Sequence, residues 1–171
     1  ISPKVAPAVP KGPVLLLHGM YSEPLDFLTR TDATALATPL QLAAQGYDVW
    51  IGCTRGREIT MGHATLDLLD PIQAAAYWNF TYDEIGREDV DALVNEIIRL
   101  RPQSCEKVQI VTHSTASNSA LVAAGDVNLN LSARVGNIVT IAPCLVQELA
   151  EFWLLAKDLP TIYAFYKQLE N

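Results

Sequence analysis

The feature that most constrains this chain is a short apolar run, residues 14–17 (VLLL), which ends abruptly at His18-Gly19. Consecutive aliphatic residues bounded by turn-forming residues are typical of a β-strand that is buried on both faces. Such strands occur in parallel sheets whose faces are covered by helices. We therefore expect residues 14–17 to form a central strand of an α/β sheet.

Further strands and helices are expected to alternate after this run. The strands are expected at residues 47–51, 107–112 and 136–142, and the helices at 33–45, 87–100 and 115–124. The helix at 87–100 has apolar residues at helical spacing and Pro102 just beyond its end. Pro39 should lie near the start of the first helix, and Gly46 should close it. This order predicts an α/β fold with a mostly parallel sheet and helices on both faces.

The length of 171 residues fits one domain with a single core. Three prolines favour an extended lead-in over residues 1–12, and residues 13–143 form the expected α/β core. Residues 144–171 are rich in aromatic side chains and are divided by Pro160. We expect them to begin a cap of helices over the sheet; the alternative is ordinary core packing.

Composition excludes several classes of function. The net charge of −7 leaves no basic surface for a nucleic acid. The longest apolar stretch near the C-terminus, residues 145–156, is interrupted by polar and acidic residues, so no transmembrane segment is expected. No cluster of ligand residues predicts a metal site, and no cofactor is expected.

The cysteines and two N-glycosylation sequons are the residues that relate to the cellular compartment of this protein. The three cysteines stand far apart and lack the close pairs of zinc or redox motifs, so we expect buried small hydrophobic side chains at Cys53, Cys105 and Cys144. Asn79 and Asn130 each begin an N-glycosylation sequon, NFT and NLS respectively. These sequons matter only in a secretory protein, and they favour that route.

Residues 108–116 (VQIVTHSTA) read as a strand, a sharp turn at Ser114 and a helix, which is the context of a nucleophile elbow. That turn needs small residues two positions on either side of the serine, because backbones approach closely there. Here those residues are Thr112 and Ala116 rather than glycines. The alternative is an ordinary serine at the end of a strand.

A second element is the turn at His18, Gly19 and Met20 after the first strand. Its backbone N–H at Met20, together with that of Thr115, would form an oxyanion hole beside Ser114. The alternative is a plain turn with a hydrogen-bonded core histidine.

These motifs occur with others in an order that resembles the acid lipase family, the gastric and lysosomal lipases, over nearly all of residues 13–143. The segments that carry the resemblance are 13–20 (PVLLLHGM), 42–50 (LAAQGYDVW), 54–56 (TRG), His63, 77–86 (YWNFTYDEIG), 89–90 (DV), the Ser114 elbow and 141–143 (IAP). The resemblance implies an α/β-hydrolase-type sheet that is incomplete at both ends in this chain. It implies a secreted or lysosomal serine esterase that hydrolyses lipid carboxylic esters through an acyl-enzyme on Ser114. In such an enzyme the expected cap at residues 144–171 would shield an acyl chain. The resemblance also implies that the amides of Met20 and Thr115 hold the oxyanion, and that Arg55 and Trp78 are structural.

The sequence departs from the family in its catalytic triad. In α/β-hydrolases the acid and the histidine follow the serine along the chain, yet His18, His63 and His113 all precede Ser114. The downstream aspartates, at positions 126 and 158, are expected as surface carboxylates or helix caps.

Two interpretations of this departure remain. The favoured one is a fragment or processed piece, inactive alone, whose acid and histidine lie in a complementary C-terminal chain. The other is a non-catalytic structural or binding module, a subunit of a larger assembly.

Overall fold

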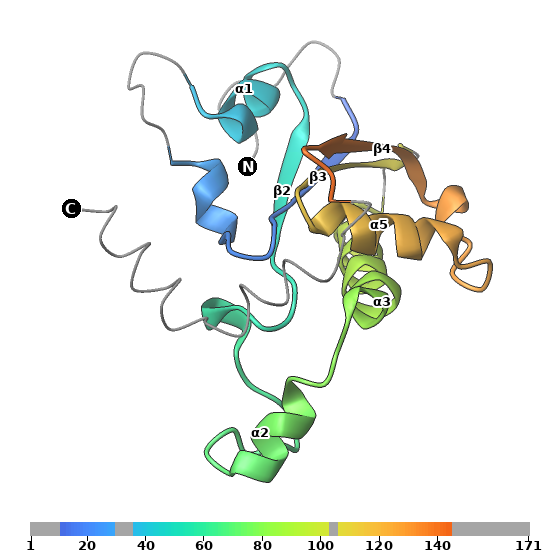
Figure 1. Cartoon of the computed structure of the whole chain (residues 1–171). Coiled ribbons are helices and arrows are strands. Elements are labelled where there is room, and N and C mark those ends of the chain that lie inside the picture. The colour runs from blue at the N-terminus through green and yellow to red at the C-terminus, as the bar shows by residue number, and fades with distance from the viewer. Residues whose placement is uncertain (1–10, 30–35, 103–105, 145–171) are drawn as a thin grey trace.

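A four-stranded parallel sheet forms the centre of the molecule (Figure 1). The computed structural model describes residues 11–29, 36–102 and 106–144. The strands are β1 (Pro13–Leu17), β2 (Asp48–Gly52), β3 (Val108–His113) and β4 (Val135–Ile141), in the spatial order β2-β1-β3-β4. The predicted α/β class is confirmed, because every strand pair is parallel and helices connect the strands.

Strand β1 is the most buried strand of this sheet. All five of its residues are buried, and Leu17 is 0% exposed. Because side chains alternate across a strand, Val14 and Leu16 belong to one core cluster while Leu15 and Leu17 belong to another. The expected central strand is therefore present.

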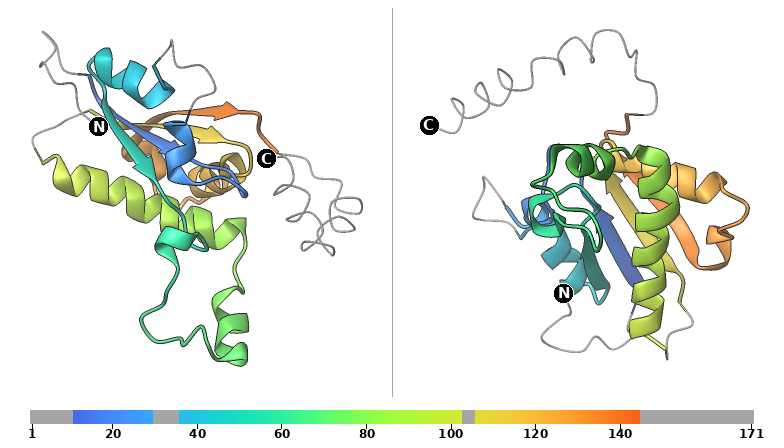
Figure 2. Two further views of the ribbon diagram at one scale, coloured as in Figure 1. Left: turned by 90° about the vertical axis from the view of Figure 1, so that its left-hand side faces the viewer. Right: turned by 90° about the horizontal axis from the view of Figure 1, so that it is seen from below.

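Helices cover both faces of the sheet (Figure 2). Helix α1 (Thr38–Ala44) contributes Ala43 to the core on the side of Val14 and Leu16. Helices α4 (Asp91–Leu100) and α5 (Ala116–Gly125) cover the opposite face, which holds Leu15 and Leu17. Pro39 lies in the first turn of α1, and the N–H of Gly46, at φ 96°, bonds to the carbonyl of Ala43 at 2.9 Å.

The helix before β3 begins earlier than its apolar spacing predicts. Helix α3 (Tyr82–Glu84) runs through a π-helical segment (Ile85–Val90) into α4. Thr81 caps this helix: its hydroxyl accepts from the Asp83 N–H at 3.2 Å, and Glu84 accepts from the Thr81 N–H at 2.7 Å. Gly86 lets the π-helical segment lie against α5, since a Cβ there would be 3.1 Å from Val122 Cβ.

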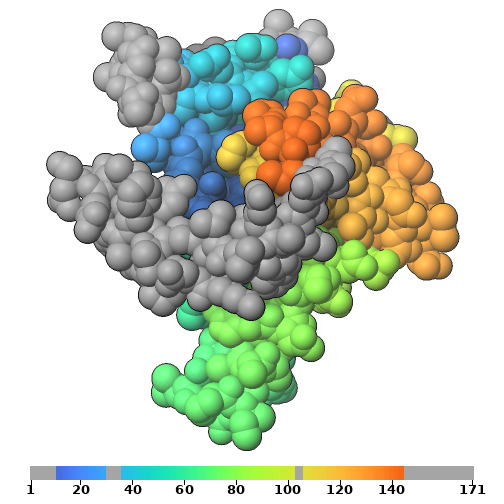
Figure 3. Space-filling view, viewed as in Figure 1, coloured from blue at the N-terminus to red at the C-terminus, as the bar shows by residue number. Residues whose placement is uncertain are grey.

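Residues 58–80 form an arm that stands away from the sheet (Figure 3). It contains a short 3₁₀ turn (Glu58–Thr60) and helix α2 (Pro71–Tyr77). Asp70 caps α2 by accepting hydrogen bonds from the backbone N–H groups of Ile72 and Gln73, at 2.9 and 3.0 Å. The sequence analysis did not predict this helix.

Two further 3₁₀ turns, Pro24–Phe27 and Leu131–Ala133, complete the described elements. The expected lead-in at 1–12 and the expected cap at 144–171 lie almost wholly outside the described residues. None of the helices in residues 11–29, 36–102 and 106–144 is both long enough and apolar enough to span a bilayer.

Candidate active site at Ser114

Ser114 occupies the turn between β3 and α5. Its φ of 54° lies in the left-handed region, which non-glycine residues seldom adopt and which stores strain. Its N–H bonds to the carbonyl of Ile141 at 2.9 Å, and its carbonyl accepts from the Ser117 N–H at 3.1 Å. The surrounding backbone therefore holds the serine in this strained turn, as a nucleophile elbow requires.

The turn after β1 lies directly against Ser114. A Cβ built on Gly19 would come within 2.9 Å of Ser114 Cβ. The parallel register, with Leu17 opposite Thr112, brings the carboxyl ends of β1 and β3 to the same edge of the sheet. Ligands of open α/β sheets bind at that edge.

Two backbone donors beside this turn have no acceptor among the described residues. Nowhere in the described part of the chain does a group accept a hydrogen bond from the N–H of Met20 or of Thr115. Unpaired N–H groups next to a nucleophile can hold the negative oxygen of a tetrahedral intermediate.

Thr112 and Ala116, which stand where an elbow commonly has glycines, are both buried beside the turn. Thr112 is 0% exposed, and its Oγ1 lies 2.9 Å from Ser117 Oγ and 3.4 Å from the carbonyl of Val139. Ala116 is 7% exposed and belongs to the core cluster on the α5 side. Sequence reasoning missed Ser117, although a serine one turn into a helix after a buried threonine can form such a pair.

The side-chain partner of Ser114 is Cys144, whose Sγ lies 3.5 Å from Ser114 Oγ. Cys144 and Cys53 are both free and half-buried, so the expectation of buried cysteines is wrong for these two. Burial raises the pKa of the Cys53 thiol. Cys105 lies outside the described residues.

The histidines that precede Ser114 have structural partners. His18 Nδ1 lies 2.9 Å from the Gly19 carbonyl, and its Nε2 accepts from the Thr54 N–H at 3.4 Å. Burial lowers the pKa of His18, which favours the neutral ring with its proton on Nδ1. His63 Nδ1 accepts from the Thr65 N–H at 3.1 Å within the arm.

The rings of His18 and His63 therefore both contact backbone groups. His18 links the turns after β1 and β2, and His63 stabilises a turn within the arm. The third histidine, His113, has its Nδ1 3.4 Å from where a Gly19 Cβ would stand. Downstream, Asp126 lies at the end of α5, where it accepts from Arg87 Nε at 2.9 Å and its side chain is 15% exposed. Asp158 lies outside the described residues.

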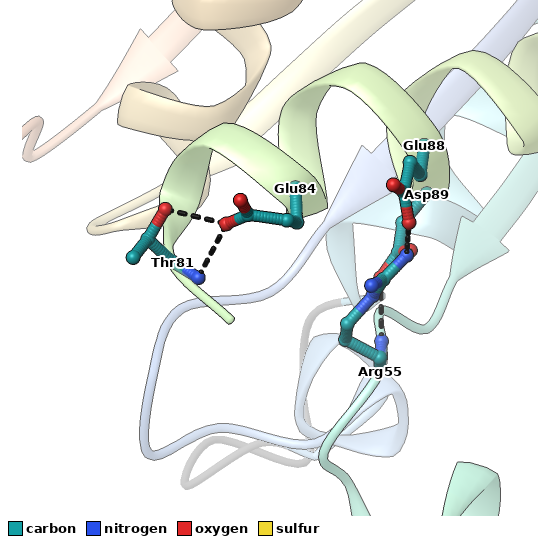
Figure 4. A network of polar contacts seen from close by, with 5 residues as sticks. All are labelled: Arg55, Thr81, Glu84, Glu88 and Asp89. Carbon is teal, nitrogen blue, oxygen red and sulfur yellow. Dashed lines mark hydrogen bonds and ion pairs between the residues drawn. The ribbon is translucent and has the colours of Figure 1, made fainter. Parts of the chain in front are cut away.

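Arg55 joins the turn after β2 to the π-helical segment that leads into α4 (Figure 4). Its Nε donates to Asp89 Oδ1 at 2.8 Å, its backbone N–H donates to Asp89 Oδ2 at 2.7 Å, and one terminal nitrogen reaches Glu88 Oε2 at 2.5 Å. The hydrogen bonds to Asp89 raise the pKa of Arg55 above its ordinary value. These contacts support the structural role expected for Arg55.

Both sequon asparagines are exposed. Asn79 lies at the end of the arm, directly before Phe80, and Asn130 lies at φ 46° before the turn Leu131–Ala133. Within the described ranges, no group of three or more histidine, cysteine, aspartate or glutamate side chains is arranged to hold a metal ion.

Comparison with known proteins identifies relatives among lipases. Lysosomal acid lipase/cholesteryl ester hydrolase of Macaca fascicularis is 30% identical over 134 residues, which cover 78% of this chain and 31% of that protein. Lipase member K of Mus musculus is 31% identical over 134 residues, with the same coverage of 78% and 31%. Triacylglycerol lipase 2 of Arabidopsis thaliana is 37% identical over 102 residues, 60% of this chain and 22% of that protein.

No family model matches the chain. The chain spans about a third of the length of the lysosomal acid lipases that it matches, 31% in Macaca fascicularis and 33% in Homo sapiens. These matches bear out the resemblance carried by the sequence motifs. The matched residues therefore place this chain in an acid lipase-like family of α/β-hydrolases.

Proposed function

We propose that this chain carries the nucleophile of a serine hydrolase that cleaves lipid carboxylic esters. The observation that carries the proposal is the position of Ser114, at φ 54° in a strand-to-helix turn with Gly19 against it. The names of two relatives, a cholesteryl ester hydrolase and a triacylglycerol lipase, support a lipid ester as the substrate class.

In the proposed reaction, Ser114 Oγ attacks the ester carbonyl and loses its proton to a general base. The N–H groups of Met20 and Thr115 stabilise the oxyanion of the tetrahedral intermediate. The ester C–O bond then breaks, the alcohol leaves with a proton from the same base, and an acyl-enzyme remains on Ser114. Water, activated by that base, releases the carboxylic acid and restores the serine.

The general base is proposed to come from outside these 171 residues. His18 and His63 are held by other partners, and the family order places acid and histidine after the serine. A further part of the full-length protein, or a complementary chain, would supply both groups. The 171-residue chain alone is then inactive, because an unactivated serine is a weak nucleophile.

The secretory pathway is the proposed route of this protein, ending outside the cell or in the lysosome. The exposure of Asn79 and Asn130 supports glycosylation at both sequons. The lysosomal acid lipases among the relatives support the same route.

A non-catalytic module is the second candidate. The contact of the Ser114 hydroxyl with a thiol, Cys144 Sγ, supports this candidate. A catalytic serine instead needs a general base as its partner.

A fluorophosphonate probe separates the two functions, because it reacts with activated serines. The full-length protein should be labelled at Ser114 and should hydrolyse a fatty acyl ester. Ser114→Ala should lose both properties, whereas Ser119→Ala, on α5 but outside the elbow, should keep both. A folded full-length protein that is not labelled would favour the module.

A further inference from the structure

A cavity lies between the arm (residues 58–80) and the helix that follows it. Its volume is about 540 Å³, and its walls include neither Ser114 nor the turn at residues 18–20. The arm contributes His63, Tyr77, Asn79 and Phe80, and the opposite wall contributes Arg55, Glu84, Glu88 and Leu93. This cavity is therefore distinct from the proposed catalytic site, and whatever fills it joins the arm to the body of the molecule.

Asn79 supplies a covalent attachment point on the wall of this cavity. It is exposed, begins the NFT sequon and lies between Trp78 and Phe80. The rings of Trp78 and Phe80 lie 6.0 Å apart at an interplanar angle of 32°, and Trp78 remains 49% exposed. An occupant attached to Asn79 thus begins next to Phe80, which also lines the cavity.

Two carboxylates on the cavity wall, those of Glu84 and Glu88, can accept hydrogen bonds. Glu84 is bonded to the hydroxyl of Thr81 at 2.6 Å, and Glu88 to Arg55 at 2.5 Å (Figure 4). A carboxylate has about four acceptor sites, so both carboxylates keep capacity for further donors. Aromatic faces beside carboxylates suit a ring that is apolar on its faces and carries hydroxyl donors at its edge, which is the chemistry of a pyranose sugar.

We propose that the occupant of this cavity is the N-linked glycan on Asn79, whose first N-acetylglucosamine packs against Phe80 and donates hydrogen bonds to Glu84 or Glu88. The inference rests on the proposed secretory route. A tethered sugar has a high effective concentration at the cavity, so weak contacts suffice to keep it there. The bound sugar then holds the arm against the helix Tyr82–Leu100 and lowers its local opening.

The test uses the full-length protein secreted with high-mannose glycans, with site occupancy read by mass spectrometry. Endoglycosidase H leaves the first sugar on each asparagine, whereas peptide N-glycosidase F removes it. Limited proteolysis in residues 58–80 reports opening of the arm, because cleavage follows the open population. Complete removal, or Asn79→Gln, should speed this cleavage about tenfold. Trimming to one sugar, or the matched control Asn130→Gln, should leave it unchanged.

The outcomes separate this inference from the secretory route. Equal cleavage before and after complete removal would overturn the inference, as would an unoccupied Asn79 in a protein glycosylated at Asn130. If trimming to one sugar speeds cleavage as much as complete removal, the outer sugars hold the arm and the proposed cavity contact is wrong. Absence of glycan at both asparagines would overturn the secretory route as well. The enzymatic comparison is made on folded wild-type protein, so it remains decisive if Asn79→Gln is not secreted.

Discussion

At the scale of single residues, the missing side chain at Gly19 sets how close the turn after β1 comes to Ser114. We expect Gly19→Ala to push the two apart, because its Cβ would stand 2.9 Å from Ser114 Cβ. The variant should lose about 1–3 kcal/mol of stability through overpacking, and probe labelling of Ser114 should fall about tenfold in the full-length protein. Denaturant unfolding and labelling kinetics measure the two effects.

Gly125→Ala is the matched control for this change. Nothing lies within 4 Å of the position that its Cβ would take, at the end of α5. It should be neutral or stabilise the protein by up to about 1 kcal/mol, since alanine loses less backbone entropy than glycine on folding. Normal labelling of Gly19→Ala would show that the turn is not pressed against the serine.

His18 gives the stability a defined pH dependence. Burial lowers its pKa in the folded protein, while the unfolded chain binds the proton near the ordinary value of about 6.5. Its contribution is therefore fully present above about pH 6.5 and is lost as the pH falls below that value. The free energy of unfolding should fall more steeply from pH 7 to pH 5 in the wild type than in His18→Gln. Equal slopes in wild type and His18→Gln would contradict this role.

The sequence predicted some of these residues better than others. The strand, the turn at Ser114 and the helix follow one another along the chain, so a local pattern was enough to predict this strand-to-helix turn. The contact of Cys144 with Ser114 joins residues 30 positions apart, and the Thr54–His18 bond spans 36 positions. Such pairs depend on the order of strands in the sheet, which local periodicity does not contain.

At the scale of elements, Arg55 is the main polar link between the turn after β2 and the π-helical segment that leads into α4. Removing it leaves Asp89, whose side chain is 13% exposed, without its cation. Arg55→Ala should reduce the free energy of unfolding by about 2 kcal/mol, the usual range for hydrogen bonds to a charged group. Arg55→Lys should recover only part of this loss, because lysine lacks the bidentate fork.

Arg99→Ala is the control for this change, because it removes an exposed arginine from α4. Its partner Glu96 lies three residues away on the surface, so the change should be below about 0.5 kcal/mol. Denaturant unfolding of all three variants provides the measurement. Equal destabilisation by Arg55→Ala and Arg99→Ala would show that the link between β2 and α4 contributes nothing.

Element bounds were predictable where hydrophobic pattern dominates. Each strand lies within one or two residues of its expected position, because alternating or continuous apolar runs mark the sheet. The start of the helix at Tyr82 was missed, since its signal is the polar capping box of Thr81 and Glu84 rather than an apolar period. Helix α2, with seven residues on the arm, has only Tyr77 buried and so carries no core-facing stripe.

At the scale of the whole molecule, the parallel sheet and the lipase relatives both support the α/β-hydrolase fold class. The strand order β2-β1-β3-β4 places the elbow between two interior strands, next to the turn that carries Met20. Family motifs predicted this arrangement because they contain long-range information that composition lacks. The arm and its cavity were not predicted, since no periodicity specifies how an irregular segment packs.

The central position of β1 also determines the order in which the protein can assemble during synthesis. β1 can pair with β2 as soon as both have left the ribosome, but its other edge waits until β3 emerges, after all of residues 53–107. Closing so long a loop is slow, and an unpaired edge of buried aliphatic residues is prone to aggregate in the meantime. We therefore expect the nascent chain to be most prone to aggregation before β3 has emerged.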